Sequence, residues 1–153
     1  MIALLDVNVL MALAWPNHEH HDLVSEWFDR HQDRGWATCP LTQSGFVRVS
    51  SNHRVPYAKS PREAVALLSQ IVDFPSHVFF PDDISLVTSR FVAIERLIGH
   101  GQVTDAHVLG IALSHRARLA TLDRGILELV PPAFKTSFPV WVLTEPRENP
   151  TPE

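Results

Sequence analysis

Short apolar runs alternate with longer stretches of helical spacing along this chain. Residues 2–5 are continuously apolar and end at Asp6, and residues 119–122, apolar apart from Thr121, end at Asp123. Such runs are typical of strands buried on both faces of a parallel sheet. Further short strands are predicted at 36–39, 77–80 and 140–143. The pattern therefore predicts about five strands.

The segments between these runs carry apolar residues at helical spacing. In residues 64–72 the apolar side chains recur on one face, after Ser60 as a helix N-cap and Pro61 as the first helical residue. The stretch 84–98 also carries an apolar stripe, follows an acidic pair and stops at Gly99, so it predicts another helix. Further helices are predicted at 8–14, 23–31, 41–49 and 104–115.

Strands that alternate with helices of this length predict an α/β fold with a mostly parallel sheet. The 153 residues, 45% of them hydrophobic, suit a single domain, which we place at 1–143, followed by a proline-rich tail at 144–153 that we expect to be flexible. The longest apolar stretch, 9–15, is far shorter than the ~20 residues of a membrane span, and no basic leader precedes it. We therefore expect no membrane association and a cytoplasmic location.

Composition excludes several kinds of site. The single cysteine, Cys39, cannot form an intramolecular disulfide or a thiolate zinc cage. The net charge of −4 gives no global positive field that would draw the chain onto nucleic acid. Any nucleic acid must therefore be held locally.

Three aspartates are candidates for the chemistry. Asp6 and Asp123 follow predicted strands, and ligands of open parallel sheets bind outside the carboxyl ends of the strands. Asp105, at a predicted helix start after Thr104, shares the stripe that should face the sheet. Each aspartate alone could be a turn former or a cap. Three gathered carboxylates would repel one another, however, and a hard divalent ion, Mg²⁺ or Mn²⁺, is the simplest compensation.

The motifs also carry a family resemblance. They are LLDVNVL at 4–10, CPLTQSGFVRV at 39–49, VTDAH at 103–107 and LATLDRG at 119–125. In this order and spacing they resemble PIN-domain ribonucleases, and more narrowly the VapC toxins of bacterial type II toxin-antitoxin systems. The resemblance covers the chain to about Leu143. It implies a Mg²⁺-dependent endoribonuclease that inhibits translation, forms a homodimer and is neutralised by a cognate VapB-type antitoxin.

The resemblance also implies roles for individual residues. Asp6 matches the first acid of the family, Asp105 the third and Asp123 the fourth, so all three are expected to bind the metal and to be catalytic. The second acid, usually glutamate, falls at Gln43, which offers a carbonyl oxygen without charge. We favour a single protein-held metal for this reason, and we expect Gln43→Glu to tighten Mn²⁺ binding. The neutral residue also leaves open a module that binds RNA or a partner without cutting.

Polar neighbours of the aspartates are further candidates. Asn8 and Thr121 lie two residues from Asp6 and Asp123, and they either orient the carboxylates or a water, or make local turn and cap bonds. The cluster His18, His20 and His21 lacks the four-residue spacing of helical metal pairs. It is interpreted as a solvated helix start, with one histidine beside the RNA path as the alternative.

Basic residues could track an RNA backbone. The densest stretch is flanked by two further residues that suit RNA, Asn52 and Tyr57, and consists of Arg48, Arg54, Lys59 and Arg62. A second group brackets the strand that ends in Asp123 and consists of Arg116, Arg118 and Arg124. An ordinary charged surface is the alternative for both groups. Two other enzyme classes are disfavoured, because a haloacid-dehalogenase phosphotransferase would need an aspartate where Asn8 stands, and a receiver domain needs an acidic pair and a late lysine that are missing.

Overall fold

Five parallel strands form the sheet at the centre of the molecule. In a computed structural model, which describes residues 1–145, every neighbouring pair of strands is parallel and the order is β3-β2-β1-β4-β5. The strands are β1 (Ala3–Leu5), β2 (Trp36–Thr38), β3 (His77–Phe79), β4 (Arg118–Thr121) and β5 (Val140–Val142). The predicted α/β class and all five predicted strands are confirmed.

The strand order reverses direction at the pair β1–β4. From β1 the chain moves outward through β2 and β3, and then returns to add β4 and β5 on the other side of β1. Leu5 pairs with Ala120, so the carboxyl ends of these two strands lie next to each other. A crevice outside the carboxyl ends at such a reversal is where open α/β sheets bind ligands.

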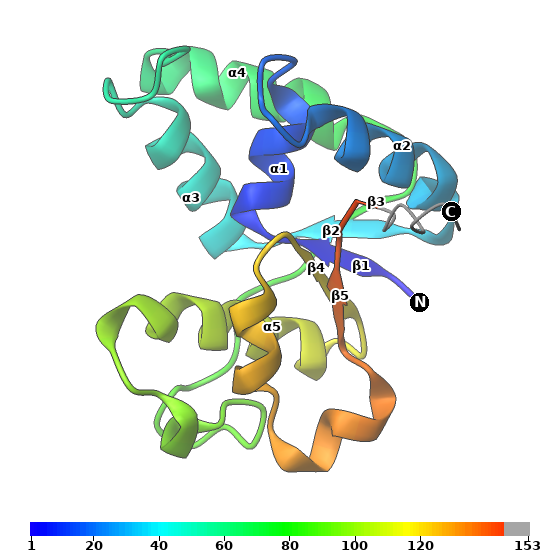
Figure 1. The fold of residues 1–153 in the computed structure, drawn as a ribbon, viewed down its shortest axis with the longest axis vertical. Helices are drawn as coiled ribbons and strands as arrows, with labels where there is room; N and C mark the ends of the chain where they lie inside the picture. The colour runs from blue at the N-terminus through cyan, green and yellow to red at the C-terminus, as the bar shows by residue number, and fades with distance from the viewer. Residues whose placement is uncertain (146–153) are drawn as a thin grey trace, which may run out of the picture.

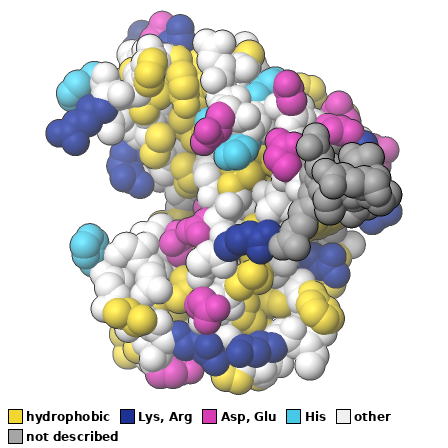
Figure 2. Space-filling model, in the orientation of Figure 1, with side chains coloured by type: hydrophobic (Ala, Val, Ile, Leu, Met, Phe, Trp, Pro, Cys, Tyr) yellow, Lys and Arg dark blue, Asp and Glu magenta, His cyan; other side chains and the backbone are white. Residues whose placement is uncertain are grey.

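Helices cover both faces of the sheet. They are α1 (Val7–Ala14), α2 (His21–His31), α3 (Pro40–Ser50), α4 (Pro61–Val72) and α5 (Val103–Ser114). The first four lie on one face, whereas α5 lies on the other with several 3₁₀ turns (Figure 1). The space-filling view is hollowed on one side, between the part that holds α3 and α4 and the part that holds the segment before α5 (Figure 2).

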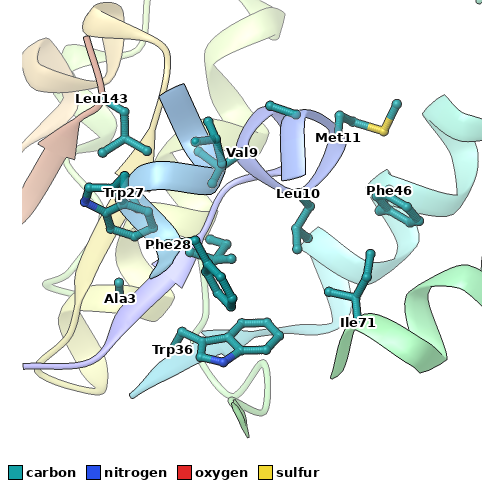
Figure 3. Packing of buried hydrophobic residues seen from close by; sticks show 14 of the residues in the cluster. Ala3, Val9, Leu10, Met11, Trp27, Phe28, Trp36, Phe46, Ile71 and Leu143 are labelled. Carbon is teal, nitrogen blue, oxygen red and sulfur yellow. The ribbon is translucent and has the colours of Figure 1, made fainter. Parts of the chain in front are cut away.

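Alternation along β1 divides the core into two layers. Ala3 and Leu5 pack with the helices of the first face, where the side chains of Trp36 and Phe28 meet edge to face at 5.2 Å between ring centres (Figure 3). Leu4 points the other way, into the layer formed with α5. Apolar side chains thus pack against β1 on both faces, which agrees with a strand buried on two sides.

The helix predicted at 84–98 is wrong. The structure has only a 3₁₀ turn, Ile94–Arg96, in this stretch, and two residues of the predicted stripe, Val87 and Ile98, are 92% and 94% exposed. Ser85 and Ser89 accept hydrogen bonds from backbone N–H groups two residues later. These local bonds offer the backbone an alternative to a helical ladder.

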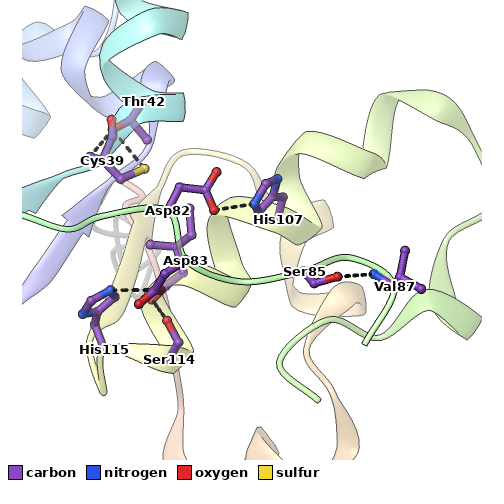
Figure 4. A network of polar contacts seen from close by, with 10 residues as sticks. Cys39, Thr42, Asp82, Asp83, Ser85, Val87, His107, Ser114 and His115 are labelled. Atoms are coloured by element: carbon purple, nitrogen blue, oxygen red, sulfur yellow. Dashed lines mark hydrogen bonds and ion pairs between the residues drawn. The ribbon is translucent and has the colours of Figure 1, made fainter. Parts of the chain in front are cut away.

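The acidic pair before this stretch binds α5 instead of opening a helix (Figure 4). Nε2 of His107 lies 2.9 Å from Oδ1 of Asp82, and Nε2 of His115 lies 4.0 Å from Oδ1 of Asp83. The ring of His115 stacks on Phe80 with 4.3 Å between centres. Side-chain contacts of this segment with α5 and with the residue that follows it thus take the place of the expected helix.

The expected flexible tail at 144–153 falls almost entirely outside the described residues, which end at Glu145. Within the described part of the chain, no helix has both the length and the apolar character needed to cross a bilayer.

Candidate active site

Asp6 is fixed where β1 ends and α1 begins. It is 8% exposed, and as the N-cap of α1 its Oδ1 accepts a hydrogen bond from the backbone N–H of Val7 at 2.7 Å. Its Oδ2 accepts a second bond, from the hydroxyl of Thr121 on the neighbouring strand, also at 2.7 Å. Burial raises the pKa of Asp6, whereas these two hydrogen bonds oppose the rise and the charge of Asp123 adds to it.

Thr121 and Asn8 connect the ends of the two central strands. The hydroxyl oxygen of Thr121 accepts from Nδ2 of Asn8 at 3.2 Å and from the backbone N–H of Asp123 at 3.0 Å. Oδ1 of Asn8 accepts from the backbone N–H of Leu122 at 3.1 Å. Both interpretations left open by the sequence hold for Thr121, which bonds the carboxylate of Asp6 and also makes a local turn bond with Asp123, whereas Asn8 contacts Thr121 and not a carboxylate.

The three candidate aspartates line one cleft of about 360 Å³. Asp105 reaches it from the first turn of α5, and Asp123, which is exposed, from the turn after β4, where its Oδ1 accepts from the backbone N–H of Gly125. The remaining lining residues are Val7, Asn8, Met11, His18, Val49 and Tyr57. Acidic side chains are visible at the inner end of the hollow in Figure 2.

The cleft is electrostatically unbalanced. Burial, together with the charges of Asp6 and Asp123, raises the pKa of Asp105 to about 6. Among the described residues, no lysine, arginine or histidine forms an ion pair with any of the three. Carboxylates that raise one another's pKa without a basic partner favour the uptake of either protons or a cation.

Gln43 is bound to a residue outside the acidic group. Its Nε2 donates to the hydroxyl oxygen of Thr38 at 2.9 Å, and the same oxygen lies 2.8 Å from Nε2 of His77. Gln43 lines a separate hollow between α3 and α4 together with Arg48, and it is not among the residues that line the acidic cleft. The site-lining role expected for Gln43 stays a prediction.

The candidate RNA-binding arginines lie in different places. Arg124 follows Asp123 directly at the carboxyl edge of the sheet, and Arg48 and Arg54 are exposed on α3 and on the loop that follows it. Arg116 precedes β4 and therefore lies at the opposite, amino-terminal edge, where it lines an apolar pocket with Phe134. The structure does not bring Arg116 to the cleft.

Sequence reasoning missed the apolar part of the cleft wall. In the sequence Tyr57 is noticeable as a neighbour of the basic stretch that holds Arg54, but nothing there indicates that it lies near the aspartates. Met11 and Val49 are ordinary members of apolar stripes. Of the histidine cluster, His18 lines the cleft, and its place beside an RNA path stays a prediction.

The sequence profile of the PIN domain matches residues 3–130, which include all three aspartates. The chain belongs to the PIN-domain family. Curated relatives place it among the VapC proteins. Ribonuclease VapC38 of Mycobacterium tuberculosis is 45% identical over 94% of this chain and 99% of its own length, and Ribonuclease VapC44 of the same organism is 41% identical over 88% and 96%.

A solved structure has the same fold as this PIN domain. It is the VapBC2 assembly of Rickettsia felis bound to a DNA fragment from its promoter, and the likeness has a TM-score of 0.55 over 85% of this chain and 96% of that one. The identity is 13%, so the comparison supports the architecture of this PIN domain and nothing finer.

The carboxylates in the cleft of this PIN domain are oxygen donors suited to a hard divalent cation, but they do not form a complete metal cage. Within residues 1–145, no three His, Cys, Asp or Glu side chains are close enough together to hold a metal by themselves. Mg²⁺ normally binds one or two protein carboxylates and completes its shell with water and substrate phosphates. The uncompensated carboxylates therefore fit such an ion, whereas a cage made only of protein ligands does not fit.

Proposed function

We propose that this PIN domain is the toxin of a VapBC-type toxin-antitoxin pair and cleaves RNA internally by Mg²⁺-dependent hydrolysis of phosphodiester bonds. The observation that carries the proposal is the convergence of Asp6, Asp105 and Asp123 on one cleft without a basic partner among the described residues. Relatives that share 40 to 45% of its sequence and match nearly their whole length are named ribonucleases.

The residues of the cleft would divide the work as follows. Asp6 and Asp105 are the carboxylates proposed to hold Mg²⁺, with Mn²⁺ as a substitute. Asp123, which the sequence suggested as a third ligand, is instead assigned to the acidic wall, because no three such side chains among the described residues are close enough to hold a metal. A bound Mg²⁺ would supply water activation and would neutralise charge that develops on the phosphate. Thr121 and the N–H of Val7 hold Asp6 in one orientation, so that the carboxylate is preorganised before RNA arrives.

The substrate and partners are also part of the proposal. RNA phosphates entering the cleft would pass Arg124 at the carboxyl edge, with Arg48 and Arg54 on α3 and the loop after it. A cognate VapB-type antitoxin would block the site, and two copies of this chain would form a homodimer. These partners imply that the protein acts in the cytoplasm.

A non-cutting module is the second candidate. It is favoured by Gln43, which is neutral and donates its amide to Thr38, so that the cleft lacks a fourth carboxylate. Such a protein would bind RNA or its partner protein with the same surface and would show no metal-dependent turnover.

Cleavage of end-labelled total cellular RNA by the antitoxin-free protein distinguishes the two candidates. Reactions with Mg²⁺, Mn²⁺ or chelator are run beside Asp105→Asn and beside Asp29→Asn, a matched change of an exposed aspartate on α2. Discrete metal-dependent fragments that only Asp105→Asn fails to produce are expected. If the wild type leaves RNA of the native host intact with Mg²⁺ and also with Mn²⁺, the proposed nuclease activity is excluded and the binding module takes its place.

A further inference from the structure

The acidic cleft has a second, apolar wall that the proposed hydrolysis does not use. Asp6 caps α1, and Val7 and Asn8 in the first turn still belong to the acidic end. Met11 lies four residues beyond Val7, about 6 Å further along the helix axis at 1.5 Å per residue. Met11 and two other residues, Val49 from α3 and Tyr57 from the following loop, form the apolar part of the cleft lining.

Tyr57 is held in place by packing around the end of α1. Its ring stacks on Trp15 with 5.1 Å between centres and 30° between planes. The indole Nε1 of Trp15 donates to the hydroxyl of Ser50 at 3.3 Å, and that hydroxyl lies 3.2 Å from the sulfur of Met11. Met11 extends from α1 toward α3 (Figure 3). The wall is therefore built from side chains that already contact one another in the free protein.

The surroundings of Tyr57 favour a polyanion. The loop at 51–60 carries Arg54 and Lys59, both exposed, and contains no aspartate or glutamate. Positive charge in the same loop as a fixed aromatic ring is a combination with which proteins bind single-stranded nucleic acid, where the bases stack and the phosphates pair with basic groups. An apolar side chain of a protein partner would not need these charges.

A hydrogen-bond donor is available at the same wall. Nδ1 of His18 accepts from the backbone N–H of His20 at 3.1 Å, so in the neutral imidazole the proton resides on Nε2. No described residue forms a hydrogen bond with Nε2. Burial, together with the neighbouring His20, lowers the pKa of His18, which keeps it a neutral donor.

We propose that this wall is a nucleobase subsite, in which the base next to the phosphate at the carboxylates stacks on Tyr57 and lies against Met11 and Val49. The inference rests on the proposed function, which assigns RNA to the cleft. It adds that the cleft accommodates one unpaired base. His18 supplies the donor for the edge of that base or for its phosphate. The subsite therefore requires single-stranded RNA at the point of attack.

Binding of two fluorescein-labelled strands tests the subsite without cleavage. One is single-stranded RNA of random sequence, and the other is an abasic ribose–phosphate strand of the same length. Both are titrated by fluorescence anisotropy into Asp105→Asn protein, alone and combined with Tyr57→Leu, which keeps apolar bulk, or Tyr57→Phe, which keeps the ring. Phe79→Leu, a change of a half-exposed aromatic on edge strand β3, is the matched control. Thermal melts of each variant confirm folding.

Tyr57→Leu is expected to weaken binding of the intact strand about tenfold, which is the scale of one base stacked on an aromatic ring, and to leave the abasic strand unaffected. Tyr57→Phe and Phe79→Leu should bind as the parent does. Equal loss on both strands, or no loss on either, would overturn the subsite. In the cleaving background, Tyr57→Leu should raise KM by the same factor with kcat nearly unchanged.

These results are separable from those of the nuclease test. A protein that binds the intact strand through Tyr57 but never cuts RNA keeps the subsite and loses the proposed hydrolysis. A protein that cuts RNA with equal KM in the wild type and Tyr57→Leu keeps the hydrolysis and loses the subsite. Failure to bind either strand, with tight binding of an apolar peptide that Tyr57→Leu abolishes, would assign the wall to a protein partner and reject the subsite.

Discussion

The hydroxyl of Thr121 donates to Oδ2 of Asp6 across the two central strands, at 2.7 Å. The same oxygen accepts from the amide of Asn8 and from the backbone N–H of Asp123, so a single side chain connects two of the three aspartates. Thr121 is fully buried. The orientation of Asp6 therefore depends on a hydroxyl that contributes no charge of its own.

Removing this hydroxyl should be costly. In Thr121→Val the shape is kept, but a buried carboxylate oxygen and two N–H donors lose their partner, and each unsatisfied group costs about 1–3 kcal/mol. We expect the free energy of unfolding to fall by at least that amount, as measured by urea denaturation. Thr121→Ser, which keeps the hydroxyl, should lose much less. Equal losses in the two variants would contradict this account, because packing of the methyl group would then contribute as much as the hydrogen bonds.

Neutralising Asp105 should separate activity from stability. Because burial and the charges of Asp6 and Asp123 raise its pKa to about 6, the ionised side chain destabilises the metal-free fold near neutral pH. Asp105→Asn should therefore abolish cleavage yet stabilise the metal-free protein, by about 1 kcal/mol after allowance for solvent screening of a half-buried group. The control Asp29→Asn should change neither property. A less stable Asp105→Asn protein would contradict the assigned electrostatics.

The same pKa determines the dependence on pH. Between about pH 4 and about pH 6 the folded protein holds a proton on Asp105 that the unfolded chain releases, so the stability of the metal-free protein should fall as pH rises through this window. Mg²⁺ binds the ionised form, so the increase in melting temperature that it causes should be larger at about pH 7.5 than at about pH 5. In Asp105→Asn this difference should become smaller, because only the raised pKa of Asp6 then remains to cause it. A Mg²⁺ effect independent of pH in the wild type would count against Asp105 as a ligand.

The strands and the acidic end of the cleft could be predicted because their signals are local. An apolar run that ends in an aspartate, as at Asp6 and Asp123, is readable from adjacent residues, and the parallel fold places strand ends at one edge. The Tyr57 wall could not be predicted in this way. Its position depends on how the loop at 51–60 folds back onto Trp15, which is a contact between distant segments.

The errors have physical reasons as well. The helix at 84–98 was predicted from apolar spacing alone, without the serines, whose hydroxyls bond the local backbone. The prediction also left out Asp82, which pairs with His107 on α5. The family pattern drew attention to the charge of Gln43, but it carried no information on where the amide points. That direction depends on Thr38, at the end of another strand.

Gln43→Glu tests whether this position belongs to the metal site. The new carboxylate would accept from the Thr38 hydroxyl in place of the present amide donation, so the fold should be retained. The added charge should tighten Mn²⁺ binding, measured by calorimetry. The companion change Ser44→Ala, at the next and exposed position of α3, should leave Mn²⁺ binding as it is. Unchanged binding in Gln43→Glu would place residue 43 outside the reach of the metal.

Gly45 is the point at which α3 packs against the start of α1, and an alanine there should impair both stability and cleavage. A Cβ at Gly45 would lie 2.5 Å from Cγ2 of Val7, a β-branched side chain with little freedom to move within a helix. Replacing a glycine inside a helix normally gains about 1 kcal/mol, but overpacking costs about 1–3 kcal/mol, so Gly45→Ala should be destabilising overall.

The functional part of this last prediction follows from the backbone of Val7, whose N–H holds Asp6. A displaced Val7 should lower kcat for RNA as well as the melting temperature. The double variant Gly45→Ala with Val7→Ala relieves the overlap, because the shortened side chain at position 7 leaves room for the new Cβ. Its losses in kcat and in melting temperature should therefore be smaller than the sum of the losses in the two single variants, which is a favourable coupling in a double-mutant cycle. Strict additivity of the two changes would show that the helices can separate without moving Asp6.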